Sequence, residues 1–418
     1  MSKTLMIKAM ALGAVACAFS ATGFAADVQN GHGQGIADST TEVNGAKHEA
    51  VRSNWMDRTD VVVGVGMKDS KETHSQHHYV GESSMRHDDL NTVTSKSSKS
   101  TEINKLYIET LQPITHYDEN AKSVVFVQGR IGRSGEKISS RALNNYWVPA
   151  RPAGTFITHD KQTDKKESLG MNANIGIGYR RLSKGEHAYV GVNAFYDHVF
   201  KGGYKRVSGG VEYVAGLNEF HANLYRNLGT DDRKYIGLRG RSNVLGDPAG
   251  LYPYGLDSNQ GLFNYGVVSY ENHWMLSEKV AASGFDVGYS RTFKNARWAR
   301  VYADYYNWRG REAVRVGYHK LKKRDAIKGF KVGAEFHITP HLTLDAGYQT
   351  ASHHLSGPYA TLKYTIGTSK FAWHGGKHSE NAITTARSKM LDKVHRSDMV
   401  VQEVEEETYD HGVVDVGL

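Results

Sequence analysis

Short segments of this chain alternate apolar and polar residues with a period of two, which is the pattern of β-strands that separate two different environments. In the clearest segment, 330–338, the even-numbered residues are apolar and the odd-numbered residues are polar or glycine. The pattern restarts at Leu342 after Thr339 and Pro340, which predicts a hairpin with a very tight turn. One face of this hairpin suits lipid and the other suits water.

A strand can cross a bilayer only when all of its backbone groups are paired, so strands with this pattern close into a barrel. A water-soluble β-sandwich would also alternate, but it would not explain why short and long connections follow one another along this chain. We therefore expect an all-β, antiparallel transmembrane barrel of about twelve strands. The strands are expected at 61–67, 106–110, 123–131, 175–179, 188–196, 207–213, 220–224, 285–289, 299–305, 330–338, 342–348 and 360–373.

Connection lengths predict the orientation of this barrel. Short turns follow strands two, four, six, eight and ten, whereas long loops follow the odd-numbered strands. These loops include a histidine-bearing one after the first strand, an irregular one at 133–166 and a basic one at 308–325. The longest, 230–280, is expected to hold strand extensions near Gly266 to Tyr270. Because bacterial barrels have short periplasmic turns and long external loops, both ends of the barrel should face the periplasm.

The start of the chain has the features of a secretory signal. Lys3 and Lys8 precede a short apolar run, and small residues lead to a cleavage point near Ala26. Residues 1–26 are thus expected to be a signal peptide, 27–59 a mobile periplasmic segment and 60–375 a barrel in the outer membrane of a Gram-negative bacterium. The single cysteine, Cys17, would be lost with the signal, which leaves no thiol for catalysis, a disulfide or metal binding.

The chain carries a formal charge of +8 and a mean hydropathy of -0.53. Its Lys and Arg residues are scattered and form no single stripe, so we expect attraction to anionic lipopolysaccharide and outer-membrane lipid, and no nucleic-acid partner. The low hydropathy is compatible with a barrel, because half of each strand faces the lumen.

Residues 376–418 are expected to form a linker helix and a short acidic tail. Apolar residues recur at helical spacing within 381–394, and a helix of this length would span about 21 Å, close to the apolar band of an outer-membrane barrel, about 25 Å. We therefore place this helix in the lumen. Extended chain from Asp398 and an acidic run at 403–407 follow it. A disordered periplasmic tail is the alternative.

Three segments of the predicted barrel resemble the β-domain of the inverse autotransporters, the family of intimin and invasin. They read Gly-Ile-Gly-Tyr-Arg-Arg at 176–181, Tyr-Val-Gly-Val-Asn-Ala-Phe-Tyr-Asp at 189–197 and Arg-Val-Ser-Gly-Gly-Val-Glu-Tyr at 206–213. The tail from Val394 to Glu403 is similar to the linker that follows the barrel in that family. The resemblance implies a twelve-stranded translocator, inserted by the barrel-assembly machinery, whose linker rises through the lumen and carries a passenger outward.

The sequence departs from this family after the linker. The chain stops at Leu418 without an immunoglobulin-like or lectin-like domain, and no peptidoglycan-binding module is recognisable before the barrel. We therefore expect a truncated passenger and a role in cell-surface display, adhesion or another interaction with a host or neighbouring cell. Any adhesive role would come from the long surface loops, chiefly 230–280. A plugged or weakly selective outer-membrane channel is the alternative.

Catalysis is not expected, and no catalytic, cofactor-binding or metal-binding residue is predicted. Asp197 and His198 stand where a strand leaves the membrane, but adjacent residues on a strand point to opposite faces and cannot cooperate directly. Lipase, protease and zinc motifs are absent from the sequence. Histidines in two external loops would hold zinc or copper only if the loops met, and a solvated polar loop is the more common arrangement; they are His74, His77, His78, His353 and His354.

Charged residues of both signs fall on the expected lumen faces. This mixture would suit either a plug that ion pairs hold in place or a weakly selective pore. The residues are Arg180, Arg206, Glu212, Arg300, Asp304, Lys331, Glu335, Asp345 and Lys363.

Overall fold

The computed structural model describes residues 55–80, 87–115, 117, 120–148, 155–229, 232–244, 265–312, 314–316, 319–321, 324–352, 356–367, 373–374 and 386–417. All of them belong to the compact unit Ala46–Leu418. The expected signal peptide, residues 27–54 and the histidines at 353 and 354 lie outside the described residues. No helix among those described is long and apolar enough to cross a membrane.

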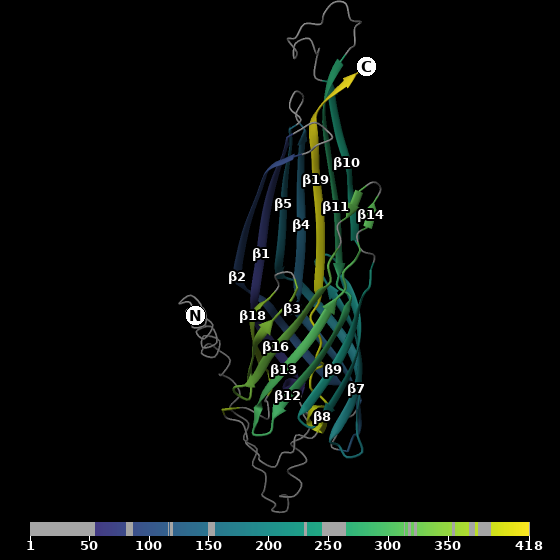
Figure 1. Cartoon of the computed structure of the whole chain (residues 1–418). Helices are drawn as coiled ribbons and strands as arrows, with labels where there is room; N and C mark the ends of the chain where they lie inside the picture. The colour runs from purple at the N-terminus through teal and green to yellow at the C-terminus, as the bar shows by residue number, and fades with distance from the viewer. Residues whose placement is uncertain are drawn as a thin grey trace, which may run out of the picture. The chain divides into compact units, whose positions relative to one another are not determined.

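Twelve antiparallel strands close into a barrel, which confirms the predicted fold class (Figure 1). Each strand pairs with the next around the ring, and the last pairs with the first, for example Val63 with Leu362. The strands are β1 (Thr59–Val80), β2 (His87–Pro113), β3 (Ser123–Arg133), β6 (Met171–Leu182), β7 (Ala188–Val199), β8 (Lys205–Ala215), β9 (Asn218–Asn227), β12 (Gly284–Phe293), β13 (Ala296–Trp308), β16 (Ile327–His337), β17 (Leu342–Gln349) and β18 (Gly357–Thr365).

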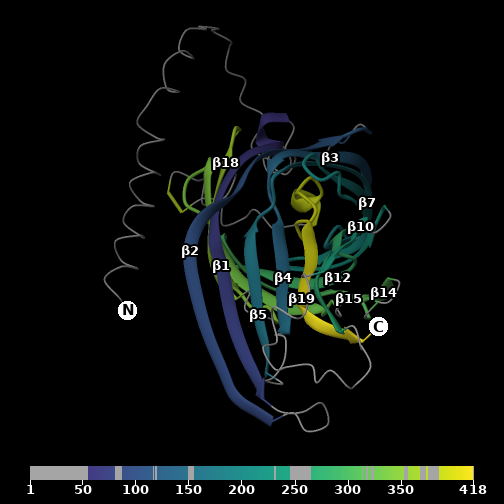
Figure 2. The ribbon, with the colours of Figure 1, turned by 90° about the horizontal axis from the view of Figure 1, so that it is seen from above.

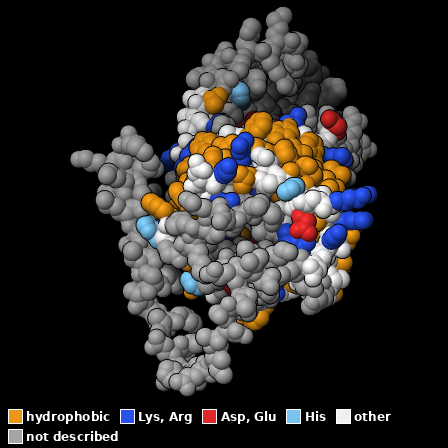
Figure 3. Space-filling view, turned by 90° about the horizontal axis from the view of Figure 1, so that it is seen from below, with side chains coloured by type: hydrophobic (Ala, Val, Ile, Leu, Met, Phe, Trp, Pro, Cys, Tyr) orange, Lys and Arg blue, Asp and Glu red, His pale blue; other side chains and the backbone are white. Residues whose placement is uncertain are grey.

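The period-two pattern of the sequence becomes the two faces of the barrel wall. In β6 and β7, buried and exposed residues alternate along nearly the whole strand. Ile175, Ile177 and Val192 are more than half exposed on the outer face, where lipid would cover them, whereas Arg180 on the inner face is fully buried. Figure 3, which views the barrel from the end opposite to the C-terminus, shows hydrophobic side chains gathered in one area with Lys and Arg around it.

Strands also continue beyond one end of the barrel. The outer parts of β1 and β2 remain paired there, and β1 pairs with β5 (Thr155–Ser168), which forms a hairpin with β4 (Glu136–Val148). A second hairpin joins β10 (Asp232–Val244) to β11 (Tyr265–Ala281). A small hairpin of β14 (Val314–Val316) and β15 (His319–Leu321) lies in the basic connection.

The prediction of an irregular loop at 133–166 is therefore wrong, because this segment is mostly the β4–β5 hairpin. The polar connection expected after the first strand is also largely strand. We expect neither face of these extensions to meet lipid, so their sequences need no apolar face and show no alternation. The expected extension near Gly266 to Tyr270 is confirmed by β11.

The segment after the barrel returns through the lumen. A 3-10 turn, η3 (Ala386–Lys389), is followed by extended chain and then by β19 (Val400–Gly417), which runs parallel to β4 and antiparallel to β11 in the external sheet. Figure 2 shows this segment inside the ring of strands, with β19 beside β4. The disordered periplasmic tail is thus excluded for residues 386–417. Another 3-10 turn, η1 (Trp55–Arg58), precedes β1.

Two predictions about this C-terminal part are wrong. Of the helix expected at 381–394, residues 381–385 lie outside the described residues, and the rest contains only the single turn η3. The barrel wall replaces a hydrogen bond that a helix would make between Val394 and Met390, because the carbonyl of Met390 accepts from Arg180 and the amide of Val394 donates to Gln128. The last barrel strand ends at Thr365 and not near Trp373, whose amide instead donates to the carbonyl of His337.

Candidate functional site: the occupied lumen

Residues 386–399, which we call the linker, are packed and bonded to the inner wall of the barrel along their whole length. At the end of the lumen away from β19, Ala386, Met390, Leu391 and Val394 are buried. They pack against an apolar patch of the wall made of Leu111, Val124, Phe126, Leu182, Tyr189, Phe195 and Val214. Burial of these side chains favours a seated linker, since each fully buried large aliphatic side chain contributes about 1.5–3 kcal/mol.

Arg387 fixes the start of the linker to the short turns of the barrel. Its guanidinium donates to both carboxylate oxygens of Glu186, at 3.0 and 2.7 Å, and to the carbonyl of Ala121 at 2.8 Å. Tyr117 donates to the carbonyl of Arg387 at 3.2 Å. Such a two-point contact between guanidinium and carboxylate sets orientation as well as position.

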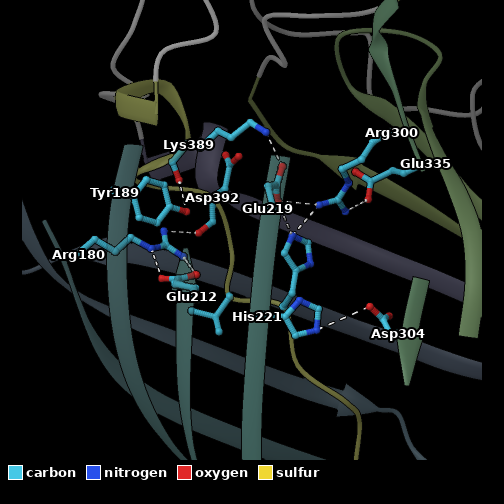
Figure 4. Close-up of polar contacts among 12 residues, drawn as sticks. Arg180, Tyr189, Glu212, Glu219, His221, Arg300, Asp304, Glu335, Lys389 and Asp392 are labelled. Carbon is cyan, nitrogen blue, oxygen red and sulfur yellow. Dashed lines mark hydrogen bonds and ion pairs between the residues drawn. The ribbon is translucent and has the colours of Figure 1, made fainter. Parts of the chain in front are cut away.

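Arg180 of β6 binds the next part of the linker through its backbone. Its Nη1 donates to the carbonyls of Met390 and Asp392, at 2.8 and 2.6 Å, while Nε and Nη2 donate to Glu212 of β8 at 2.5 and 3.0 Å (Figure 4). The guanidinium also lies over the ring of Phe126, 4.6 Å from its centre. Arg180 is fully buried, so this one side chain joins two wall strands to the linker in a site closed to bulk solvent.

A second arginine site, formed by Arg206 and Arg396, binds the upper part of the linker. Asp197 of β7 accepts from Arg206 of β8 at 2.9 Å and from two nitrogens of Arg396 of the linker at 2.7 and 2.6 Å. Arg206 in turn donates to the carbonyls of Ser397 and Asp398, at 3.0 and 3.3 Å. One buried carboxylate therefore balances two buried guanidinium groups, one from the wall and one from the linker.

Three more charged side chains of the linker form ion pairs with the wall. Asp398 forms ion pairs with Lys105 at 3.0 Å and with Arg130 at 2.7 Å. Two further ion pairs run from linker lysines to wall carboxylates, namely Lys389 with Glu219 and Lys393 with Asp60. Figure 4 shows Lys389 directed at Glu219.

His395 lies in a mixed group of charges near the middle of the lumen. Arg300 of β13 donates from Nη1 to Nε2 of His395 at 2.6 Å and from Nη2 to Glu335 at 2.6 Å. The same Nε2 lies 3.5 Å from Oε2 of Glu219. The carbonyl of His395 accepts from Asn223 at 3.0 Å.

The exit from the lumen is closely fitted to the backbone of the linker. The amides of Glu136 and Ala282 donate to the carbonyls of Met399 and Val400, at 3.0 and 2.8 Å. Gly135 has φ of +88°, and a Cβ there would lie 2.3 Å from the carbonyl oxygen of Met399. Only glycine combines this backbone conformation with so close an approach. Strand β19 then begins between the two external hairpins.

Outside the barrel, acidic residues of β19 pair with cations of the neighbouring strands. Glu403 binds Lys137 of β4 at 2.8 Å and also Lys279 of β11, and Glu407 binds Arg141 at 2.6 Å and His273 at 2.9 Å. The acidic run is therefore part of the sheet.

These ion pairs lower the pKa of both carboxylates. Burial raises the pKa of Glu403, but hydrogen bonds from Lys137 and Lys279 outweigh burial and bring the pKa below its usual 4.5. Burial likewise raises the pKa of Glu407, but hydrogen bonds from Arg141 and His273 outweigh burial, so this pKa is also below its usual value. The stability that the two pairs contribute is present above the ordinary pKa and is lost as the pH falls through the lowered one.

All nine charged residues predicted to face the lumen do lie there. Arg180, Arg206 and Arg300 contact the linker directly, and Glu212 and Glu335 pair with two of them. The other four, Asp304, Lys331, Asp345 and Lys363, line a cavity of about 280 Å³ beside the linker. Five further wall partners were not predicted, although each lies on a lumen face of the period-two pattern: Asp60, Lys105, Arg130, Asn223 and Glu219.

The other candidate residues do not form a site among the described residues. Asp197 is in the lumen with its two arginines, whereas the ring of His198 lies on the opposite face beside Tyr196 and Phe200. His74 bonds to Glu72 at 2.6 Å on the external part of β1. In the part of the chain that is described, no three His, Cys, Asp or Glu side chains converge as metal ligands would.

Comparison with known proteins identifies one family. The pattern described as "Inverse autotransporter, beta-domain" matches residues 157–398, which is more than half of the chain. Among curated proteins there is no match. One similar solved structure, from a study of the in-meso crystallization of membrane proteins, has 13% identity and a TM-score of 0.43 and covers 81% of this chain and 99% of its own. The translocator domain of the autotransporter NalP from Neisseria meningitidis has 10% identity and a TM-score of 0.21, and covers 72% and 88%.

Proposed function

Since this chain belongs to the inverse autotransporter β-domain family and is an outer-membrane β-barrel, we propose that it holds its own linker in the lumen and displays residues from Val400 onward at the surface of a Gram-negative cell. The displayed part serves adhesion or another contact with a host or neighbouring cell. The barrel-assembly machinery inserts the barrel, and outer-membrane lipid with lipopolysaccharide surrounds it.

The path of the linker is the observation that carries this proposal. It enters beside the short turns at Glu186 and Ala121, crosses the lumen and joins the sheet beyond the other end. Because short turns are periplasmic in bacterial barrels, this path leads from the periplasm to the cell exterior. β19 pairs there over thirteen positions with β4, from Glu136 to Val148, so the exported segment has a fixed place.

A non-catalytic role agrees with the chemistry of the lumen. Two of its buried carboxylates are paired with cations, Asp197 with Arg206 and Glu219 with Arg300 and Lys389, and this leaves both poor general bases. A perturbed carboxylate that catalyses proton transfer would instead be held near neutral pKa and within reach of a substrate.

A plugged or weakly selective channel is the second candidate, and the cavity of about 280 Å³ beside the linker favours it. Charges of both signs line this cavity, for example Lys331 and Asp345, so it would discriminate weakly between small anions and cations. The two candidates differ in whether the linker is retained for display or only narrows the lumen.

Attachment of cells tests the proposed adhesion. A Gram-negative laboratory strain that expresses the full chain is expected to attach to epithelial cells more than the same strain without it. A variant that ends at Met399 lacks β19 but retains the linker, and attachment should fall to near background. Both barrels carry an epitope within 245–264 so that equal surface amounts are compared. Equal attachment by the two barrels would show that β19 is not required, and no attachment by either would refute the adhesive role.

A further inference from the structure

A groove lies on the outer wall of the barrel, over strands β8, β9 and β12. Its volume is about 740 Å³. The floor is the strand backbone, behind which lie lumen residues such as Asn193 and Asp286. The outward-facing residues around it are Val207, Gly209, Val211, Ala222, Leu224, Phe285 and Val287.

Two small residues create this groove. Gly209 of β8 pairs with Leu224 of β9, and Val211 pairs with Ala222. Gly209, which has no side chain, and Ala222, which has a short one, are therefore diagonal neighbours on the two strands. A Cβ added to Gly209 would meet only the carbonyl oxygen of Asn193, at 3.9 Å, which means that the space outside this residue is open. Leu224, 69% exposed, and Val211, 55% exposed, stand beside the open space. In a bilayer such a groove must be filled with hydrocarbon.

The two ends of the groove differ in chemistry. Towards the periplasm, Tyr213, Phe220 and Tyr289 follow the groove along the same outward rows, with ring centres 6.5 Å apart for the first two and 4.9 Å apart for the last two. Towards the outside, Arg226 of β9 lines the groove and pairs with Val207 of β8. Lys205 is the next outward-facing residue of β8 beyond Val207. Both cations are exposed on the lipid-facing side.

We propose that this groove binds lipid A of the outer leaflet, with one acyl chain over Gly209 and Ala222 and a phosphate on Arg226 and Lys205. The apolar space requires a hydrocarbon chain, and the cations at its external end require an anion at the height of the outer headgroups. Guanidinium groups bind phosphate through paired hydrogen bonds, and an ammonium adds a second charge. An anionic glycolipid of the outer leaflet combines these features in one molecule.

Groove and cations can be removed separately. Gly209→Leu would put an apolar side chain into the groove, and its Cβ would meet only the carbonyl oxygen of Asn193, at 3.9 Å. Arg226→Gln removes the charge at its external end and leaves the groove in place. The matched control is Arg291→Gln, because Arg291 also lies on the exposed face of one of these strands, β12, but next to the short turn at its periplasmic end.

Native mass spectrometry of the purified full chain in detergent measures lipid retention. We expect one lipid A per barrel, with affinity reduced about tenfold by Arg226→Gln and also by Gly209→Leu, and unchanged in Arg291→Gln. Heat-modifiable migration on gels verifies that each variant is folded. Equal retention of phosphatidylglycerol would overturn the assignment to lipid A. Full affinity in Gly209→Leu would overturn the groove, and full affinity in Arg226→Gln would overturn the phosphate site.

Discussion

Replacement of Asp197 by alanine is expected to destabilise the barrel by about 3–5 kcal/mol, because it leaves two guanidinium groups buried without their common anion. Arg206 is fully buried, and it and Arg396 bond to Asp197 at distances of 2.6 to 2.9 Å. The loss would fall on both sides of the interface between wall and linker. The linker should therefore also become accessible to protease more readily than in the parent chain.

Urea unfolding of the detergent-solubilised protein, followed by tryptophan fluorescence, measures this effect. The control is Glu167→Ala, which removes a partly exposed carboxylate that pairs with Lys137 at 3.5 Å outside the barrel. An exposed pair of this kind contributes about 0–1 kcal/mol. If Asp197→Ala lowers the free energy of unfolding no more than Glu167→Ala does, the buried arginine site does not stabilise the barrel as described.

A chain that ends before Asn381 is expected to conduct ions several times better than the full chain in planar bilayers. A twelve-stranded barrel is wider than its own side chains can fill, so the linker accounts for much of the occupied lumen. The deletion removes the apolar residues from Ala386 to Val394, the carbonyls that Arg180 binds and the carboxylate of Asp398. It therefore opens the space beside the cavity of about 280 Å³.

The matched control for this deletion is the chain that ends at Met399. It keeps every linker residue in the lumen and removes only β19, so its conductance should stay as low as that of the full chain. Unchanged conductance after deletion from Asn381 would contradict the account of a linker that closes the lumen. A high conductance in both shortened chains would instead assign the closure to the external sheet.

The sequence predicted the membrane part of the fold well because the bilayer imposes a simple rule on it. Lipid on one side and a polar lumen on the other leave a period-two pattern in segments such as 175–179 and 330–338. The external strands β4 and β5 have no such asymmetry, since water reaches both faces, and their polar sequences resemble those of loops. Their pairing with β1 and β19 depends on residues far away in the chain.

The sequence predicted which charged residues face the lumen, but it did not predict the contacts that they make there. Alternation places Arg180 and Arg206 in the lumen, but it cannot say that they bond to backbone carbonyls of the linker. The expected helix failed for the same reason, since apolar spacing from Ala386 to Leu391 indicates burial, and the wall donors decide the backbone conformation. The sequence singled out Asp197 as one residue of a family-like motif and as a rejected catalytic partner of His198, and its partner Arg396 comes from almost two hundred residues later in the chain.

Surface labelling of intact cells tests the central claim most directly. The chain carries an epitope after Leu418, and a second version carries the same epitope within 245–264 as a positive control. Because the linker crosses the lumen and β19 pairs outside it, the C-terminal epitope should be labelled without permeabilisation, as the loop epitope is. If only the loop epitope is labelled, and the C-terminal one appears after the outer membrane is opened, the segment does not leave the barrel and the display function is wrong.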